Sequence, residues 1–120
     1  MGDISKYFNR SEFACKCGCG MADISHDLVT VLDKIREMVG RPLVIASGCR
    51  CDKHNQAEGG KEDSAHCNGL AVDIRVNDSH ERHDLLLFAI QQGIQRIGIA
   101  KTFIHIDIAT TKPQDVVWLY

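Results

Sequence analysis

The chain has 120 residues, of which 44% are hydrophobic and 25% charged, a composition that fits one compact domain spanning residues 1–120. Its formal net charge of -2 argues against a nucleic-acid partner, because there is no excess of Lys and Arg to neutralise phosphates. No apolar run approaches the roughly 20 residues that cross a bilayer, and the first residues lack the pattern of a signal peptide. We therefore expect a monomer that is made in the cytoplasm and has no membrane partner.

Apolar periodicity and stop signals predict two helices. The first covers residues 25–39, where apolar residues recur at helical spacing and Gly40 follows as a stop signal. The second opens at Asp78, where Asp78 and Glu81 resemble a capping box, and it ends near Gly93.

Short apolar or alternating segments predict four strands, over residues 43–46, 70–76, 94–99 and 103–109. Residues 47–64, rich in Gly, Cys and charge, are expected to form a long loop of the kind that often carries function. Together these elements indicate a single α+β domain with a mainly antiparallel sheet.

The segment 64–73 carries the main chemical signal. His66 leaves the loop, Gly69 permits a sharp turn, and Asp73 follows seven residues after His66 on the next strand. His105 lies on the polar face of another strand, which would pair antiparallel with the Asp73 strand and bring the two side chains about 5 Å apart. Zinc accepts imidazole nitrogen and carboxylate oxygen, and a catalytic site uses three protein ligands. The sequence therefore predicts one Zn²⁺ per chain, held by His66, Asp73 and His105.

The six cysteines are harder to interpret. Cys15, Cys17 and Cys19 alternate, Cys49 and Cys51 do the same, and Cys67 stands alone. Because C-x-C differs from the C-x2-C spacing typical of zinc sites, a second metal site is only one of three alternatives. The others are disulfides or redox-labile pairs, and free thiols.

The same residues resemble a known family. The pattern Ser64-x-His66-x-x-Gly69-x-Ala71-x-Asp73 is similar to a signature of the zinc D-alanyl-D-alanine carboxypeptidase family, which includes related phage endolysins. Further similarities lie in residues 11–13 and 47–50, and in Asn55, residues 103–107 and Trp118. The resemblance implies the α+β fold that this family shares with the hedgehog signalling domain, and zinc-dependent hydrolysis of a peptidoglycan peptide.

Three further residues have expected roles beside the ligands, one of them implied by the resemblance. Arg50 resembles the arginine that contacts the substrate and supports the oxyanion, while Ser64 either donates a hydrogen bond to the substrate or caps a turn. Relatives place an acid three residues before the last His ligand, but this chain has Thr102 there, which cannot serve as a base. Asp107, on the same strand face as His105, is expected to act as the general base or to orient a ligand.

Three functions compete at this level. The first is a peptidase that trims a terminal D-alanine or cuts inside the stem peptide, as a phage lysin acting on the cell wall after release would do. The second is a zinc-binding module of the same fold that lacks catalysis and binds a partner, an alternative that Thr102 keeps open. The third is a thiol-based redox protein, which the absence of a C-x-x-C motif disfavours.

Overall fold

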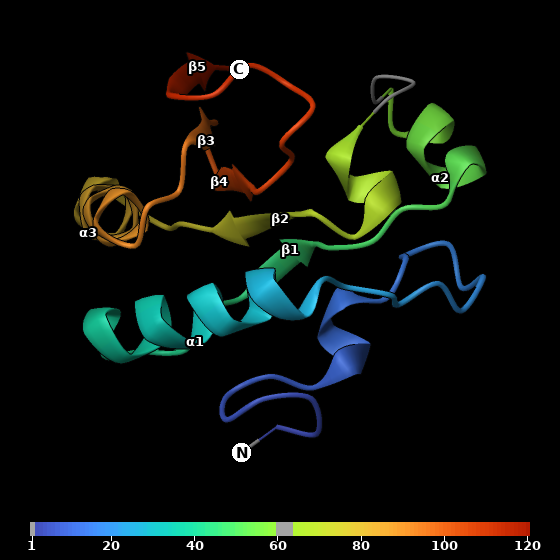
Figure 1. Cartoon of the computed structure of the whole chain (residues 1–120), viewed down its shortest axis with the longest axis horizontal. Coiled ribbons are helices and arrows are strands. Elements are labelled where there is room, and N and C mark those ends of the chain that lie inside the picture. Colours follow the sequence, from blue (N-terminus) through green and yellow to red (C-terminus); the bar gives the residue numbers. More distant parts are fainter. Residues whose placement is uncertain (1, 60–63) are drawn as a thin grey trace.

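The computed structural model describes residues 2–59 and 64–120. Figure 1 shows the chain as a mixture of helices and strands, with α1 and α3 at one end of the view and the shorter α2 at the other. In chain order the elements are η1 (Arg10–Phe13), α1 (His26–Val39), β1 (Ile45–Ser47), α2 (Asp52–Ala57), η2 (Ala65–Asn68), β2 (Ala71–Arg75), α3 (Ser79–Gln91), β3 (Arg96–Ile99), β4 (Phe103–Asp107) and β5 (Val116–Leu119).

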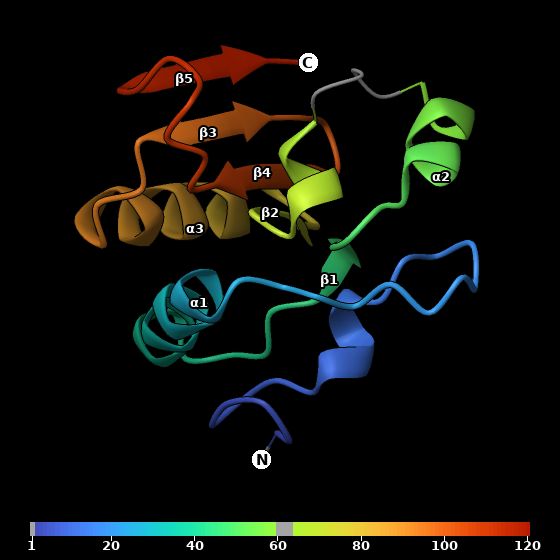
Figure 2. The same ribbon diagram turned by 45° about the vertical axis from the view of Figure 1, so that its right-hand side comes forward.

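The five strands form one sheet in the order β1-β2-β4-β3-β5. Every neighbouring pair is antiparallel except β3 and β5, which run parallel. Figure 2 shows β4, β3 and β5 side by side in that order. The predicted α+β domain with a mainly antiparallel sheet is confirmed.

The hydrophobic core lies between the sheet and the two long helices. Ile104 and Ile106 of the central strand β4 are fully buried, in one apolar cluster with Leu32 of α1 and Leu85 of α3. Since side chains alternate across a strand, packing these isoleucines into the core places His105 on the opposite face of the sheet. The core thus leaves one sheet face free for polar chemistry.

Both predicted helices are confirmed, with local signals that explain their ends. The Ser25 side chain accepts a hydrogen bond from the Leu28 N–H at the start of α1, and Gly40 ends that helix in the left-handed conformation. Asp78 caps α3 by accepting from the Glu81 N–H. Within the described residues 2–59 and 64–120, no helix is long and apolar enough to span a membrane.

Two elements depart from the sequence-based expectation. The expected loop over residues 47–64 contains the six-residue helix α2, which is polar on nearly all sides and so gives no apolar periodicity. The strand β5 was not predicted, because it is a short edge strand whose residues alternate between half-buried and exposed. It adds to the sheet by parallel pairing with β3, a long-range contact that the local sequence does not indicate.

Candidate metal centre

Pairing of β2 with β4 brings two of the predicted ligands together. Asp73 lies directly opposite His105 in this antiparallel pair, as the sequence predicted. The His105 Nδ1 atom is 3.0 Å from Asp73 Oδ1, and both residues are buried. A carboxylate and an imidazole are thus held face to face by the register of the central strands.

The third predicted ligand, His66, is delivered by the short helix η2 and the turn that follows it. Ser64 caps η2 by accepting a hydrogen bond from the His66 N–H at 3.2 Å. Gly69 then takes a φ of 69°, and a Cβ at this position would lie 2.0 Å from the Asp23 carbonyl oxygen, so only glycine fits. This turn leads directly into β2 and places His66 Nε2 3.3 Å from Asp73 Oδ1.

The donor atoms of these three buried residues suit a metal ion. One ligand atom from each of His66, Asp73 and His105 can be chosen so that all lie within 4.8 Å of one another. His66 Nδ1 lies 2.7 Å from the Gly48 carbonyl, which can only accept, so Nδ1 carries a proton. In neutral His66 the Nε2 lone pair therefore faces the Asp73 carboxylate. Two hydrogen-bond acceptors that face each other repel, and a cation bound between them would remove this repulsion.

The pKa of Asp73 agrees with a metal site at these three residues. Burial opposes ionisation of Asp73, but the contacts of its carboxylate with the His105 and His66 rings outweigh burial and lower the pKa of Asp73 to about 2. Asp73 is therefore a carboxylate at neutral pH and is available as an anionic oxygen ligand. Nitrogen and oxygen donors of this kind, in a set of three, match a catalytic zinc site.

Asp107 lies on the far side of the His105 ring from Asp73. Its Oδ2 is 2.6 Å from His105 Nε2, and its Oδ1 accepts hydrogen bonds from Arg96 Nε at 2.7 Å and from the Ala109 N–H at 3.2 Å. Burial raises the pKa of Asp107, but these donors outweigh it and the pKa is lowered overall. Both Asp107 oxygens thus accept hydrogen bonds, and Oδ2 holds the His105 ring through Nε2.

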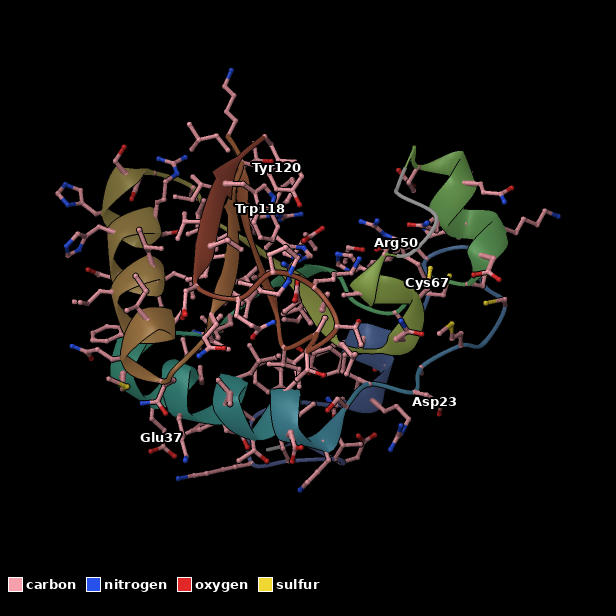
Figure 3. All side chains as sticks on the ribbon, turned by 45° about the horizontal axis from the view of Figure 1, so that its top comes forward. Asp23, Glu37, Arg50, Cys67, Trp118 and Tyr120 are labelled. Atoms are coloured by element: carbon pink, nitrogen blue, oxygen red, sulfur yellow. The ribbon has the colours of Figure 1, made fainter. Side chains whose placement is uncertain are left out.

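Arg50 approaches the Asp73 carboxylate from the loop before α2. Its guanidinium donates to Ser47 Oγ at 3.2 Å, to Asn55 Oδ1 at 3.3 Å and to Asp73 Oδ2 at 3.4 Å. In Figure 3, Arg50 lies beside η2, whereas Trp118 of β5 and Tyr120, which follows β5, lie across from it. The three contacts fix a cation next to the ligand cluster.

A comparison with protein families now places this arrangement. The sequence model described as peptidase M15 matches residues 6–107, which include all three candidate ligands, Arg50 and Asp107. The chain belongs to the peptidase M15 family. A comparison with curated proteins found no match. M15 membership makes the chain a metallopeptidase, in agreement with the resemblance to zinc D-alanyl-D-alanine carboxypeptidases.

The M15 match ends at Asp107, yet residues beyond it contribute to the site. The Trp118 ring centroid lies 5.3 Å from that of His105, and the Arg96 guanidinium lies over the Trp118 ring at 5.0 Å. Between His105 and Trp118 in the sheet stands Gly98, where a Cβ would lie 2.6 Å from Trp118 Nε1. The missing side chain lets the indole cover His105.

Sequence reasoning missed Arg96 and the packing role of Gly98. The alternation of β3 does place Arg96 and Gly98 on the face opposite Ile97, but a glycine and an arginine in a strand carry no metal-binding signal of their own. Thr102, which stands at the position where relatives have an acid, is exposed, and its backbone carbonyl accepts from the Val76 N–H.

Proposed function

We propose that this M15 metallopeptidase uses zinc and hydrolyses the stem peptides of bacterial peptidoglycan, as a D,D-carboxypeptidase or an endolysin-type endopeptidase. The observation that carries the proposal is the convergence of His66, Asp73 and His105 beside the fixed guanidinium of Arg50. The peptidoglycan substrate rests on the resemblance of residues 64–73 to the zinc D-alanyl-D-alanine carboxypeptidases.

His66, Asp73 and His105 would hold the zinc ion. When bound, zinc supplies Lewis acidity, which polarises a peptide carbonyl and makes a nucleophile available from water near neutral pH. The Gly48 carbonyl fixes the tautomer of His66, and Asp107 fixes that of His105, so each ring presents its remaining nitrogen toward Asp73.

Arg50 is the residue we assign to the substrate. Its planar group offers fixed donors for the oxygen that becomes negative during peptide hydrolysis, or for the terminal carboxylate of a D-alanine. The contacts to Ser47 and Asn55 hold the guanidinium in place before the substrate arrives, so little reorganisation is required. Ser64, whose hydroxyl oxygen caps η2, remains a candidate hydrogen-bond donor to the substrate.

Asp107 is better suited to positioning than to proton transfer from water. Its two oxygens accept from His105, Arg96 and the Ala109 backbone, and its side chain is only 1% exposed. We therefore assign Asp107 the role of orienting His105.

The test is hydrolysis of a defined muropeptide by the purified, zinc-loaded chain. Release of free D-alanine indicates a carboxypeptidase, whereas cleavage within the stem or its cross-bridge indicates an endopeptidase. A His66→Ala variant is the control, because it removes one ligand from the site. No cleavage of any peptidoglycan peptide by the folded, zinc-loaded chain would contradict the proposed substrate.

A further inference from the structure

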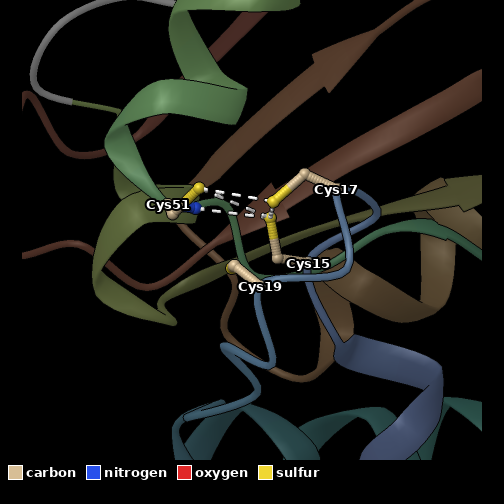
Figure 4. Close-up of side chains that lie close together, drawn as sticks. All are labelled: Cys15, Cys17, Cys19 and Cys51. Carbon is tan, nitrogen blue, oxygen red and sulfur yellow. Dashed lines mark hydrogen bonds between the residues drawn. The ribbon is translucent and has the colours of Figure 1, made fainter.

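A second group of candidate metal ligands lies outside the site described above. The Cys15 and Cys17 sulfurs are 3.4 Å apart, and the Cys51 sulfur lies 3.9 Å from Cys15 and 3.6 Å from Cys17. With Cys19 they form a set of four sulfurs that all lie within 4.8 Å of one another. Figure 4 shows Cys15 and Cys17 of the N-terminal loop facing Cys51, with Cys19 near Cys15.

The separations of these sulfurs fit a tetrahedral metal site. With zinc-sulfur bonds of about 2.3 Å, the ligands of a regular tetrahedron are about 3.8 Å apart, close to the three sulfur-sulfur separations of 3.4, 3.6 and 3.9 Å. A disulfide requires sulfurs about 2.05 Å apart. All six cysteines lie among the described residues, and each is a free thiol there.

Glycine turns explain how alternating cysteines reach one centre. Gly18 and Gly20 have φ values of 83° and 89°, in the left-handed region that glycine adopts without strain. The loop is closed by hydrogen bonds from the Cys15 N–H to the Met21 carbonyl and from the Gly18 N–H to the Cys15 carbonyl. These turns fold the C-x-C-x-C segment back on itself, so the usual C-x2-C spacing is not needed.

Backbone donors also point at the sulfurs. The Cys51 N–H lies 3.5 Å from the Cys15 sulfur, and the His54 N–H lies 3.4 Å from the Cys51 sulfur. Such N–H groups stabilise thiolates, and outer hydrogen bonds of this kind orient the ligands of metal sites.

We propose that Cys15, Cys17, Cys19 and Cys51 bind a second, structural zinc ion. Four thiolates complete the coordination sphere of zinc and leave no position for water or substrate. Binding transfers the thiol protons to solvent and involves no oxidation, so it needs no further reactant. The peptidase proposal concerns other residues, and either proposal can fail without the other.

This site would tie the N-terminal loop to the residue that follows Arg50. The backbones of these two segments are already linked beside the cluster, because the Cys49 N–H donates to the Phe13 carbonyl at 2.8 Å. The Arg50 N–H in turn donates to the His66 carbonyl at 3.1 Å. A metal at the four cysteines would therefore restrain the segment that carries Arg50 on its Cys51 side, while the Cys49 hydrogen bond holds its other side.

Metal stoichiometry tests the proposal. The full chain, purified under reducing conditions with zinc, is expected to hold two zinc ions by elemental analysis and native mass spectrometry. Cys17→Ser and Cys19→Ser, at exposed positions, should each retain one zinc, as should His66→Ala. The matched control is Cys67→Ser, which lies outside the cluster and should retain two.

Cobalt substitution separates the two sites by their ligands. Thiolate-to-cobalt charge-transfer absorption should persist in His66→Ala and be lost in Cys17→Ser, with circular dichroism confirming that each variant folds. If one serine variant does not fold, the other supplies the same test. A wild-type chain with one zinc and six titratable thiols, or a disulfide among the four cysteines, would overturn the proposal.

Discussion

Replacing Asp107 by asparagine separates a positioning residue from a general base. The carboxylate accepts a hydrogen bond from His105 Nε2 at 2.6 Å, which leaves the Nδ1 lone pair free toward Asp73. If the asparagine oxygen keeps the bond from Arg96, its amide NH₂ faces Nε2 and requires the opposite tautomer, with the proton on Nδ1. The change therefore removes the metal-facing lone pair of His105 while leaving its ring in place.

The expected loss of zinc affinity follows from what hydrogen-bond partners of ligating histidines contribute. Loss of an outer partner of a ligating histidine typically weakens metal affinity by about 10- to 100-fold, or roughly 1.4 to 2.8 kcal/mol. Zinc affinity of Asp107→Asn, measured by competition with a chelator, should fall within that range. Asp84→Asn is the matched control, because Asp84 is a half-exposed aspartate on α3, far from the ligand set, whose partner is His83.

Turnover at saturating zinc then decides between the two roles. A positioning residue predicts that activity largely recovers once the site is filled, whereas loss of a general base leaves a deficit of about 10²- to 10⁴-fold. Unchanged zinc affinity together with such a deficit in kcat would refute the positioning role and make Asp107 the base.

Three further changes test neighbouring parts of the site. His66→Ala should abolish zinc at the His/Asp/His site, and unchanged binding there, with the thiols blocked, would refute this ligand assignment. Arg50→Lys should keep zinc but lower kcat/KM by an amount equal to roughly 2 to 4 kcal/mol of transition-state stabilisation. The reason is that lysine lacks the planar fork that reaches Ser47, Asn55 and Asp73. Near-equal kcat/KM values for the two proteins would reject the substrate role of Arg50. Gly98→Ala should displace the Trp118 indole, shift the fluorescence of this single tryptophan and cost about 1 to 3 kcal/mol in urea unfolding, and an unaltered spectrum would contradict the packing argument.

The strand faces that carry Asp73 and His105 could be anticipated because they depend on local rules. The alternation of residues 70–76 and 103–109 puts Asp73 and His105 on polar strand faces, and the structure pairs these two residues directly. Likewise, the apolar spacing and the Gly40 stop signal define α1 closely. Strand period and helix period are properties of a few consecutive residues, so sequence alone predicted these strand faces and this helix, while the ligand assignment stays a prediction.

Other features depend on contacts between distant segments, and no short pattern encodes them. The Arg96 contact to Asp107 requires the pairing of β3 with β4, and the cover that Trp118 gives His105 requires the parallel edge strand β5. The proximity of Cys51 to Cys15 joins residues 36 positions apart in the chain. The two roles considered for Asp107 could be weighed only once its partners were known.

The close approach of Gly48 to Phe13 has a consequence for shortened versions of the chain. A Cβ on Gly48 would lie 2.8 Å from the Phe13 carbonyl oxygen, so the two backbones touch, and the Gly48 carbonyl is the group that fixes the His66 ring. Deleting the residues up to Phe13 would remove this support, although none of them belongs to the proposed ligand set. We expect such truncations to lower metal occupancy at His66, because the Gly48 backbone would lose its contact with Phe13 and hold the His66 ring less firmly.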